Sequence, residues 1–269
     1  MDYVQLHEQL ATFSRSAGGV AIVLDRVDST SDYLRRNWPA QAAGGAAWSV
    51  CVAKAQTAGR GRHGHVWHSA AGAGLWFSLA MPVAPIVGAR EAQPPLSLVL
   101  AVEIIQCLRR YGFPILLKWP NDLWLRDAKV GGLLIEQLGR LDSRYWLVGV
   151  GLNWQTPSEA LADKTGAMRA ATGLTTEIDA KEGWREPLSM ALIAATVACI
   201  QSPQTWAAKM AEIKPLNALF GRKIQVWDAN HLHNQGTACD ILPNGTLILI
   251  TDEGEVYPID GAYSVRLQI

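Results

Sequence analysis

The sequence predicts an α+β fold built on a mixed sheet, followed by a small C-terminal β-barrel. Strand-like and helix-like segments interleave over the first two hundred residues without a regular βαβ repeat, which disfavours a doubly wound fold. After Ile213-Lys214-Pro215 the pattern changes to short strands separated by turns, with no expected helix. We therefore predict a larger domain over residues 1–215 and a small β-domain over 216–269.

The strands expected in the larger region are short and mostly apolar on both faces, as buried sheet strands are. They cover Ala21–Leu24, Trp48–Ala53, Leu75–Met81, Ile115–Lys118, Gly131–Leu138 and Tyr145–Gly151. Apolar residues recur at helical spacing over Pro95–Tyr111, and Gly112 ends that helix. Two further helices are expected over Glu186–Cys199 and Thr205–Ile213.

The C-terminal region consists of short strands and turns. The expected strands cover Lys223–Trp227, Thr237–Leu242, Thr246–Thr251, Val256–Ile259 and Tyr263–Ile269. Asn244-Gly245 between two alternating strands is a strong hairpin signal. Three basic residues against six acidic ones give this region a net charge of −3, so the larger region carries +3.

Composition excludes several classes of protein. The chain has 24 Lys+Arg and 24 Asp+Glu, and a net charge of zero argues against a surface that binds nucleic acid or an anionic membrane over its whole extent. No apolar run reaches the ~18 residues of a membrane span, and Met1-Asp2-Tyr3 does not begin a secretory signal. The cysteines are far apart and form no C-x-x-C, which indicates reduced core thiols in a cytoplasmic protein: Cys51, Cys107, Cys199 and Cys239.

The most informative stretch runs from Lys54 to Ser69. It contains three permanent cations, three histidines and three glycines, and it contains no acidic residue. Glycines let the backbone bend closely around a ligand, and arginines supply forked donors that match carboxylate or phosphate oxygens. Gln56 and Trp67 bracket the glycines with an amide and a large ring. A ligand-binding loop is the favoured interpretation, and a solvated, mobile basic loop is the alternative.

Three common motif interpretations of this stretch do not hold. Residues 59–64 match G-x-G-x-x-G. A dinucleotide site requires a helix directly after the glycines and an acidic residue ~20 positions later. Here no helix is expected to follow, and no acidic residue lies between Arg60 and Arg90. A Walker A motif fails because no Gly-Lys-Ser/Thr follows. His63, His65 and His68 have no cysteine or carboxylate beside them, which disfavours a metal site.

Two further segments combine a cation with strand ends. Lys118-Trp119-Pro120-Asn121-Asp122 puts an amide and a carboxylate in a proline turn. Asp122 there orients either a lysine nucleophile or a metal, unless Asn-Asp forms only an Asx turn. Lys129 stands before Gly131-Gly132 at the entrance of a buried strand, where glycines allow close approach of a ligand. A solvated lysine is the simpler alternative.

Two shorter segments carry polar groups next to small residues. Asp28-Ser29-Thr30-Ser31-Asp32 precedes a helical turn, so one hydroxyl caps the helix and a second hydroxyl can bind a polar neutral head group. Gly149-Val150-Gly151-Leu152-Asn153 ends a strand with small residues and an amide, which suits the floor under a flat ring.

Together, and in this order, these segments resemble the biotin protein ligases. The marks of that family are D-S-T-N, Q-x-x-G-R-G-R-x-G-R-x-W, K-W-P-N-D, K-x-x-G-I-L-x-E and G-x-G-x-N. The resemblance covers roughly residues 20–155 and, more loosely, Ser264-Val265-Arg266. Ser31, His65 and Leu133 depart from the pattern, whereas the glycine frame, Arg60 and Arg62 are intact.

The resemblance implies a catalytic domain like those of class II aminoacyl-tRNA synthetases, with a C-terminal SH3-like barrel. It implies an ATP-dependent ligase that works with Mg²⁺ and forms biotinyl-5'-AMP. The enzyme then transfers biotin to a lysine of the biotin carboxyl carrier domain of acetyl-CoA carboxylase. Only about twenty residues precede the first expected strand at Ala21, so we expect a monofunctional ligase without a DNA-binding module. A homodimer and the identity of the Mg²⁺ ligands stay open.

The resemblance also implies roles for particular residues. Those expected to bind biotin are Ser29, Thr30, Gln56, Gly59, Arg60, Lys129, Gly132, Leu134 and Gly151. Those expected to bind ATP or the adenylate are Arg60, Arg62, Trp67, Asn121, Lys129, Asn153 and Arg266. Arg62, Lys129 and Asp122 are the catalytic candidates, with Asp122 orienting the acceptor lysine. The rival hypotheses are a lipoate-type protein ligase and a non-catalytic module that binds a nucleotide or RNA.

Overall fold

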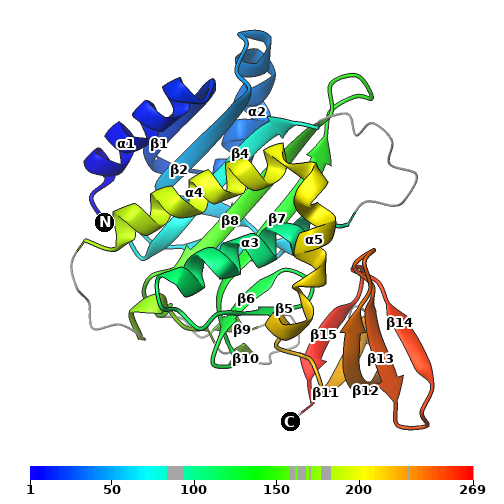
Figure 1. Cartoon of the computed structure of the whole chain (residues 1–269). Helices are drawn as coiled ribbons and strands as arrows, with labels where there is room; N and C mark the ends of the chain where they lie inside the picture. The colour runs from blue at the N-terminus through cyan, green and yellow to red at the C-terminus, as the bar shows by residue number, and fades with distance from the viewer. Residues whose placement is uncertain are drawn as a thin grey trace.

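A computed structural model describes residues 1–83, 94–157, 161–162, 168–169, 171–176, 183–228 and 231–268 of the chain (Figure 1). Its larger part is an eight-stranded sheet in the order β1-β2-β4-β8-β7-β6-β5, with β3 paired to β2. The strands are β1 (Gly19–Val27), β2 (Trp48–Arg60), β3 (Val66–Ser69), β4 (Gly74–Pro82), β5 (Leu116–Lys118), β6 (Asp122–Leu125), β7 (Ala128–Leu138) and β8 (Tyr145–Asn153). The β1–β2 pair is parallel and the other described pairs of this sheet are antiparallel, so the predicted mixed sheet is confirmed.

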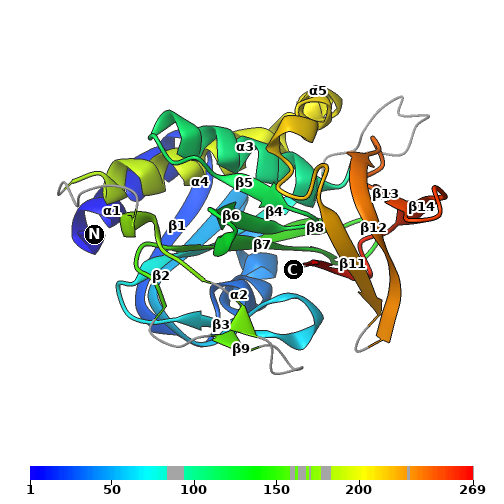
Figure 2. The ribbon, with the colours of Figure 1, turned by 90° about the horizontal axis from the view of Figure 1, so that it is seen from below.

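Helices cover both faces of this sheet (Figures 1 and 2). The described helices are α1 (Tyr3–Ser16), α2 (Thr30–Ala43), α3 (Leu96–Arg110), α4 (Arg185–Gln201) and α5 (Trp206–Ala211). Helix α2 connects the parallel strands β1 and β2 and lies alone on one face, whereas α3 and α4 pack together on the other (Figure 2). The expected helix over Thr205–Ile213 is shorter in the structure, because Pro203–Thr205 forms a 3₁₀ turn ahead of α5.

The basic stretch from Lys54 to Ser69 is a β-hairpin, which corrects the expectation of a loop. Strand β2 continues through Arg60, a 3₁₀ turn covers Arg62–Gly64, and β3 returns alongside β2. Gly59 stands opposite Trp67 in this pairing. A Cβ atom at Gly59 would lie 2.3 Å from the Trp67 carbonyl oxygen, so glycine is required for the two strands to approach this closely.

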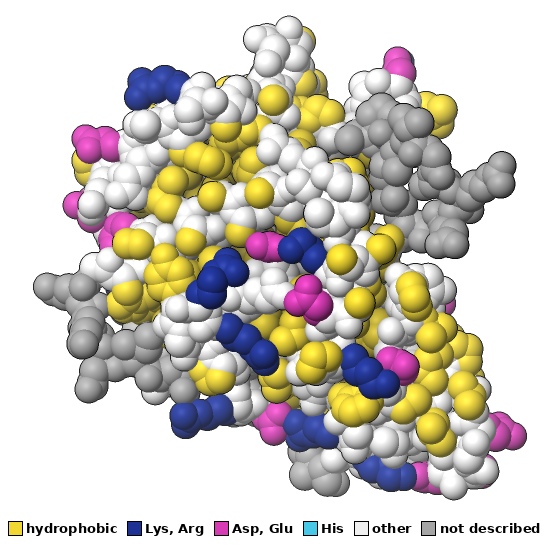
Figure 3. All heavy atoms as spheres, in the orientation of Figure 1, with side chains coloured by type: hydrophobic (Ala, Val, Ile, Leu, Met, Phe, Trp, Pro, Cys, Tyr) yellow, Lys and Arg dark blue, Asp and Glu magenta, His cyan; other side chains and the backbone are white. Residues whose placement is uncertain are grey.

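The C-terminal region is a five-stranded antiparallel sheet in the order β14-β13-β12-β11-β15. Its strands are β11 (Lys223–Asp228), β12 (His231–Ile241), β13 (Leu247–Thr251), β14 (Val256–Ile259) and β15 (Ser264–Leu267). Gly245, in the turn between β12 and β13, has a φ of +86°, as the predicted Asn-Gly hairpin requires. This sheet forms a separate lobe in the space-filling view, with hydrophobic side chains along its surface (Figure 3). It agrees with the predicted small β-domain.

The two sheets share one continuous hydrophobic core. Buried Ile224 and Val226 of β11 belong to the same cluster as Leu117 and Trp119 beside the first sheet. The indole N–H of Trp119 donates to the carbonyl of Gly245 at 3.0 Å. The predicted boundary after residue 215 falls within the 3₁₀ turn Lys214–Leu216, and it stays a prediction.

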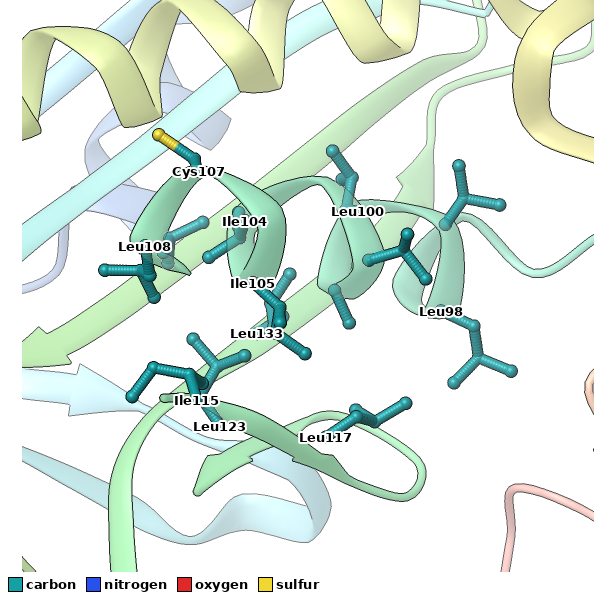
Figure 4. Packing of buried hydrophobic residues seen from close by; sticks show 14 of the residues in the cluster. Leu98, Leu100, Ile104, Ile105, Cys107, Leu108, Ile115, Leu117, Leu123 and Leu133 are labelled. Carbon is teal, nitrogen blue, oxygen red and sulfur yellow. The ribbon is translucent and has the colours of Figure 1, made fainter. Parts of the chain in front are cut away.

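The core of the first sheet follows the alternation of side chains along each strand. Val50 and Val52 of β2 face the cluster under α3 and α4, whereas Cys51 faces a smaller cluster under α2. The residues of α3 that pack over β5–β7 are those at helical spacing (Figure 4). Buried Ile105 lies next to Leu133 in this view, and Leu108 lies on the side of Ile115, so the helix seals the sheet from which the polar segments emerge (Figure 4).

A two-stranded ribbon, β9 (Leu161–Ala162) with β10 (Met168–Arg169), lies outside both sheets. All four cysteines are unpaired, as expected, and three of them are buried. Burial raises the pKa of Cys51 and that of Cys199 to about 12, which makes both thiols inert near neutral pH. No helix in the described part of the chain is long and apolar enough to cross a lipid bilayer.

Candidate active site

The hydroxyls at the start of α2 meet the amide of the basic hairpin. Ser29 is the N-cap of α2, as its motif predicts, and its hydroxyl accepts from the Asp32 N–H at 3.4 Å. The backbone N–H of Thr30 donates to Oε1 of Gln56 at 2.8 Å, and the Thr30 hydroxyl lies 3.1 Å from the same oxygen. Nε2 of Gln56 donates to the hydroxyl of Ser69 at 2.8 Å. Two of the expected biotin-binding residues are therefore in direct contact.

Two buried serines extend this polar group and were not among the predicted site residues. Ser78 lies in the middle of β4, fully buried, with its hydroxyl 2.8 Å from that of Thr30 and 2.8 Å from that of Ser31. The signal in the sequence was weak: one serine inside the apolar strand Leu75–Met81. A buried hydroxyl needs a hydrogen-bonding partner, so such a residue indicates a polar network without naming its members.

Lys129 and Asp122 form an ion pair over the glycines of β7. Lys129 Nζ lies 2.6 Å from Oδ1 of Asp122 and 5.2 Å from the centre of the Trp67 ring. Lys118 approaches the other carboxylate oxygen of Asp122 at 3.9 Å. A Cβ atom at Gly132 would lie 3.5 Å from both Oδ1 of Asp122 and Nζ of Lys129. The lysine motif and the proline-turn motif therefore meet, and the carboxylate sits between two ammonium groups.

Arg62 connects the hairpin to both sheets. Its guanidinium donates to Oδ1 of Asn121 at 3.0 Å and to the carbonyl of Gly261 in the second sheet's last turn. Asn121 is itself oriented, because its side-chain amide donates to the carbonyl of Leu133 at 2.7 Å. Burial lowers the pKa of Arg62 from its ordinary value, and Asp122 acts in the opposite direction. The guanidinium is therefore a poorly solvated cation held between two ordered partners.

Arg60 belongs to a separate cluster of charges. Its guanidinium donates to Oδ1 of Asp32 at 3.1 Å and to the two carboxylate oxygens of Glu136 at 3.0 and 3.2 Å. Arg35 also donates to Glu136, at 2.8 Å. Arg60 was expected to face a ligand carboxylate, and in this structure its donors face two carboxylates of the protein.

Trp67 covers the small residues at the end of β8. A Cβ atom at Gly151 would lie 2.5 Å from the Trp67 ring, so the indole rests on the strand backbone. Leu134 lies on β7 in register with Gly149 of the same glycine motif. A Cβ at Gly149 would lie 3.1 Å from the hydroxyl of Ser31, so glycine at position 149 makes room for this hydroxyl.

A cavity of about 310 Å³ opens beside the indole. Its lining includes Gln56, Trp67, Ser69, Trp76 and Asn153. Asn153 is buried, and its side-chain amide donates to the carbonyl of Thr172 at 3.2 Å. The cavity therefore brings the amide of the hairpin, its tryptophan and the terminal amide of the glycine motif to one space.

Arg266, the last of the expected site residues, lies in the second sheet. Arg266 lies on β15 and stacks over Trp227 at 4.4 Å within the second sheet, while Gly261 makes the contact with Arg62. The described residues contain no group of three or more His, Cys, Asp or Glu side chains that could hold a metal ion. Asp122, the carboxylate at the centre of the site, is already paired to lysine, so we derive no step through a protein-bound magnesium ion.

The polar segments thus meet in a mixed α+β domain. Amides and the Trp67 ring line a small cavity, and Lys129 lies against the same ring. Residues 23–153 match the model of the Biotin/lipoate A/B protein ligase family, a range that contains all five motif segments. Residues 23–153 therefore carry the domain of this family.

Curated relatives are similar over about half of the chain. The Bifunctional ligase/repressor BirA of Escherichia coli (strain K12) is 35% identical over 156 residues, which are 56% of this chain and 45% of that protein. The Biotin--[acetyl-CoA-carboxylase] ligase of Paracoccus denitrificans is 34% identical over 149 residues, 54% of this chain and 59% of that protein. The matches therefore span about half the length of these relatives.

Solved structures share the fold over almost the whole chain. Biotin protein ligase from Aquifex aeolicus in complex with biotin and ATP has a TM-score of 0.69 and 24% identity, covering 92% of this chain and 99% of that one. Because the match covers 92% of this chain, it extends over residues of both sheets, and it shows the fold.

Proposed function

We propose that this protein is a biotin protein ligase that activates biotin with ATP and transfers it to a lysine of a carrier domain. The observation that carries the proposal is the contact between motif segments that are distant in the sequence. Thr30 contacts Gln56, Arg62 contacts Asn121, and Lys129 contacts both Asp122 and Trp67. Separate segments with separate structural roles would have no reason to bring their cations, carboxylate and amides into contact in this way.

The first step joins two anions. An oxygen of the biotin carboxylate attacks the α-phosphorus of ATP, the bond to pyrophosphate breaks, and biotinyl-5'-AMP forms. Lys129 and Arg62 reduce the repulsion between carboxylate and phosphate, because fixed cations in a poorly solvated site stabilise negative charge strongly. ATP enters as its magnesium complex, with the metal held by phosphate oxygens.

The second step transfers the acyl group. The amine of the acceptor lysine attacks the acyl carbon, AMP leaves with the bonding electrons, and the amine loses a proton. Asp122 is the candidate for orienting that amine, since its carboxylate already holds two ammonium groups, those of Lys129 and Lys118. The hairpin that carries Trp67 covers the site and excludes water from the mixed anhydride.

The remaining expected residues take binding roles. Ser29, Thr30, Gln56 and Gly59 would surround the head group of biotin beside Gly132, Leu134 and Gly151. Arg60 would turn from Glu136 to the ligand carboxylate, and Asn153 would bind adenine at the cavity. Arg266 would bind the adenylate from β15, the strand that follows the Gly261 turn. The unpaired cysteines support a reducing, cytoplasmic location.

The partner follows from the same chemistry. The relative from Paracoccus denitrificans is called a biotin--[acetyl-CoA-carboxylase] ligase. We infer that the acceptor here is the biotin carboxyl carrier domain of acetyl-CoA carboxylase. The family also includes lipoate ligases by its description, which makes lipoate the competing substrate.

Transfer of radiolabelled biotin to a purified carrier domain tests the proposal. Label should appear on the carrier only with ATP and magnesium, and a carrier whose acceptor lysine is replaced by arginine should stay unlabelled. A parallel reaction with labelled lipoate and its carrier should give no product. Transfer of lipoate instead of biotin, or nucleotide binding without turnover, would overturn the proposal in favour of one of its two rivals.

A further inference from the structure

Four hydrogen-bonding side chains form one chain through the sheet at the proposed head-group subsite: Ser31, Ser78, Thr30 and Gln56. We propose that Ser78 is a positioning residue that fixes the direction of the protons in this chain, so that the subsite selects head groups that donate N–H bonds. The inference rests on the proposed function and deepens it, since it concerns how the same site recognises its substrate.

The direction begins at Gln56, whose amide has one possible orientation. The backbone N–H of Thr30 can only donate, and it lies 2.8 Å from Oε1 of Gln56. The other end of the amide, Nε2, faces the hydroxyl of Ser69 at 2.8 Å. The oxygen of Gln56 therefore points at Thr30. Because this oxygen carries no hydrogen, the Thr30 hydroxyl, at 3.1 Å, must donate to it.

Each further proton is then determined in turn. A hydroxyl has one proton, and that of Thr30 is used on Gln56, so the 2.8 Å bond between Thr30 and Ser78 uses the proton of Ser78. The 2.8 Å bond between Ser78 and Ser31 uses the proton of Ser31 for the same reason. All three hydroxyl protons point along the chain toward Gln56, and the hydroxyls offer a ligand only their lone pairs.

Lone pairs accept and cannot donate, so the matching ligand must bring the hydrogens. The ureido group of biotin has two N–H donors, whereas the dithiolane ring of lipoate has none. A site whose buried acceptors are left unpaired by a ligand disfavours that ligand strongly. The chain therefore favours biotin over lipoate through the direction of its protons as well as through its polarity.

Ser78 is the link that the ligand does not need to touch. It is fully buried in β4, in register with Cys51 on one side and Gly149 on the other. Without its hydroxyl, the proton of Ser31 has no acceptor in the chain and becomes free to point toward the ligand. The subsite would then offer a donor as well as acceptors, and its preference for N–H groups would weaken.

The kinetic test compares Ser78→Ala with a matched control, Ser49→Ala. Ser49 is also fully buried, on the neighbouring strand β2, and its hydroxyl has no hydrogen-bonding partner among the described residues. Ser78→Ala should raise the KM for biotin by up to about tenfold, because a Ser31 proton that turns toward the ligand opposes its N–H groups, while the KM for ATP changes by less than about twofold. Ser49→Ala should leave both KM values unchanged, with Tm of both variants recorded.

The decisive measurement uses a biotin analogue methylated at one ureido nitrogen. By calorimetry, wild-type protein should bind biotin at least about tenfold more tightly than the analogue, and this ratio should fall to within about threefold in Ser78→Ala. Thr30→Val breaks the chain at the next link with little change in shape and should reduce the ratio in the same way. A ratio of affinities does not depend on the fraction of protein that is folded.

The outcomes separate the two proposals. An unchanged ratio in both variants, with biotin still transferred to the carrier by wild-type protein, would overturn the role of Ser78 and leave the proposed function standing. If wild-type protein neither binds nor transfers biotin, the proposed function fails and the inference fails with it.

Discussion

The two sheets hold their polar side chains in different ways. In the eight-stranded sheet, Lys129 and Asp122 pair while only 24% and 13% of their side-chain surfaces are exposed, and Ser78 is completely buried. In the five-stranded sheet, Lys223 and Asp252 pair with 52% and 47% exposed. The second sheet also exposes large apolar side chains such as Val256. The first sheet thus buries polar groups that the second leaves in water.

This difference indicates which polar groups serve a ligand. Removing a charge or a hydroxyl from water costs free energy that its partners only partly return. A fold that needed only stability would leave such groups on its surface, as the second sheet does. Lys129 and Asp122 lie in the motif segments, and Ser78 contacts Thr30 of another motif segment, so binding and catalysis explain the cost of burying these groups.

The strongest test of this comparison is Lys129→Ala. We expect adenylate formation to fall by about 10²–10³-fold, since a fixed cation at the reacting phosphate is removed. Lys118 stays near Asp122, so the carboxylate keeps a partner and the fold should persist. The measurement is biotin-dependent exchange of labelled pyrophosphate into ATP.

The control for Lys129→Ala is Lys209→Ala. Lys209 pairs with Glu103 between α5 and α3, with exposures of 20% and 16% that match the Lys129 pair. Like Lys129→Ala, Lys209→Ala should lower the free energy of unfolding by about 1–2 kcal/mol, but it should keep the wild-type rate of pyrophosphate exchange. Equal activity losses in the two variants would mean that burial of an ion pair, rather than its place in the site, accounts for the effect.

Arg62→Gly should have the next largest effect. The variant removes the donors to Asn121 and to Gly261, which connect the hairpin to both sheets. A lost charged hydrogen bond is worth about 1.5–3 kcal/mol, which corresponds to roughly 10–100-fold faster escape of biotinyl-AMP. The released adenylate would label lysines of a bystander protein such as serum albumin, and a blot for biotin measures that labelling.

Arg109→Ala is the matched control for Arg62→Gly. Arg109 also donates to a backbone carbonyl, that of Ile115 at 3.1 Å, away from the cavity. It should leave bystander labelling at the wild-type level. Retention of the intermediate in Arg62→Gly would remove Arg62 from the proposed enclosure of the adenylate.

The sequence predicted six of the eight strands of the first sheet and all five of the second, because their apolar patterns are local. Strands β3 and β6 were not predicted, because they are short and begin within the polar motif segments. The motif segments could be grouped by their resemblance to one family, and the contact of Thr30 with Gln56 agrees with that grouping. Helix α1 was not predicted, although Asp2 caps it and Leu6 and Leu10 are spaced as on one helix face. These signals are local too, so the sequence contains the information that specifies this helix.

The missed parts of the site depend on contacts between distant residues. Arg60 meets Glu136 across 76 positions, and Ser78 meets Ser31 across 47. Such pairs follow from the order and register of the strands, which no local pattern specifies. The hairpin was likewise expected as a loop, because its glycines favour bends and its pairing depends on the close approach at Gly59.

The smallest expected effect concerns an exposed ion pair of the second sheet, and it tests whether the charges of that sheet contribute to activity. Lys223→Ala removes the ion pair with Asp252, in which both side chains are about half exposed. Solvent screens such pairs, so unfolding in urea should show a loss below about 1 kcal/mol. Adenylation and transfer should be unchanged, because the contact of the second sheet with Arg62 is made by Gly261 and does not involve Lys223. A drop in transfer with normal adenylation would instead show that the charges of the second sheet help to receive the carrier domain, and the division of roles between the sheets would then be wrong.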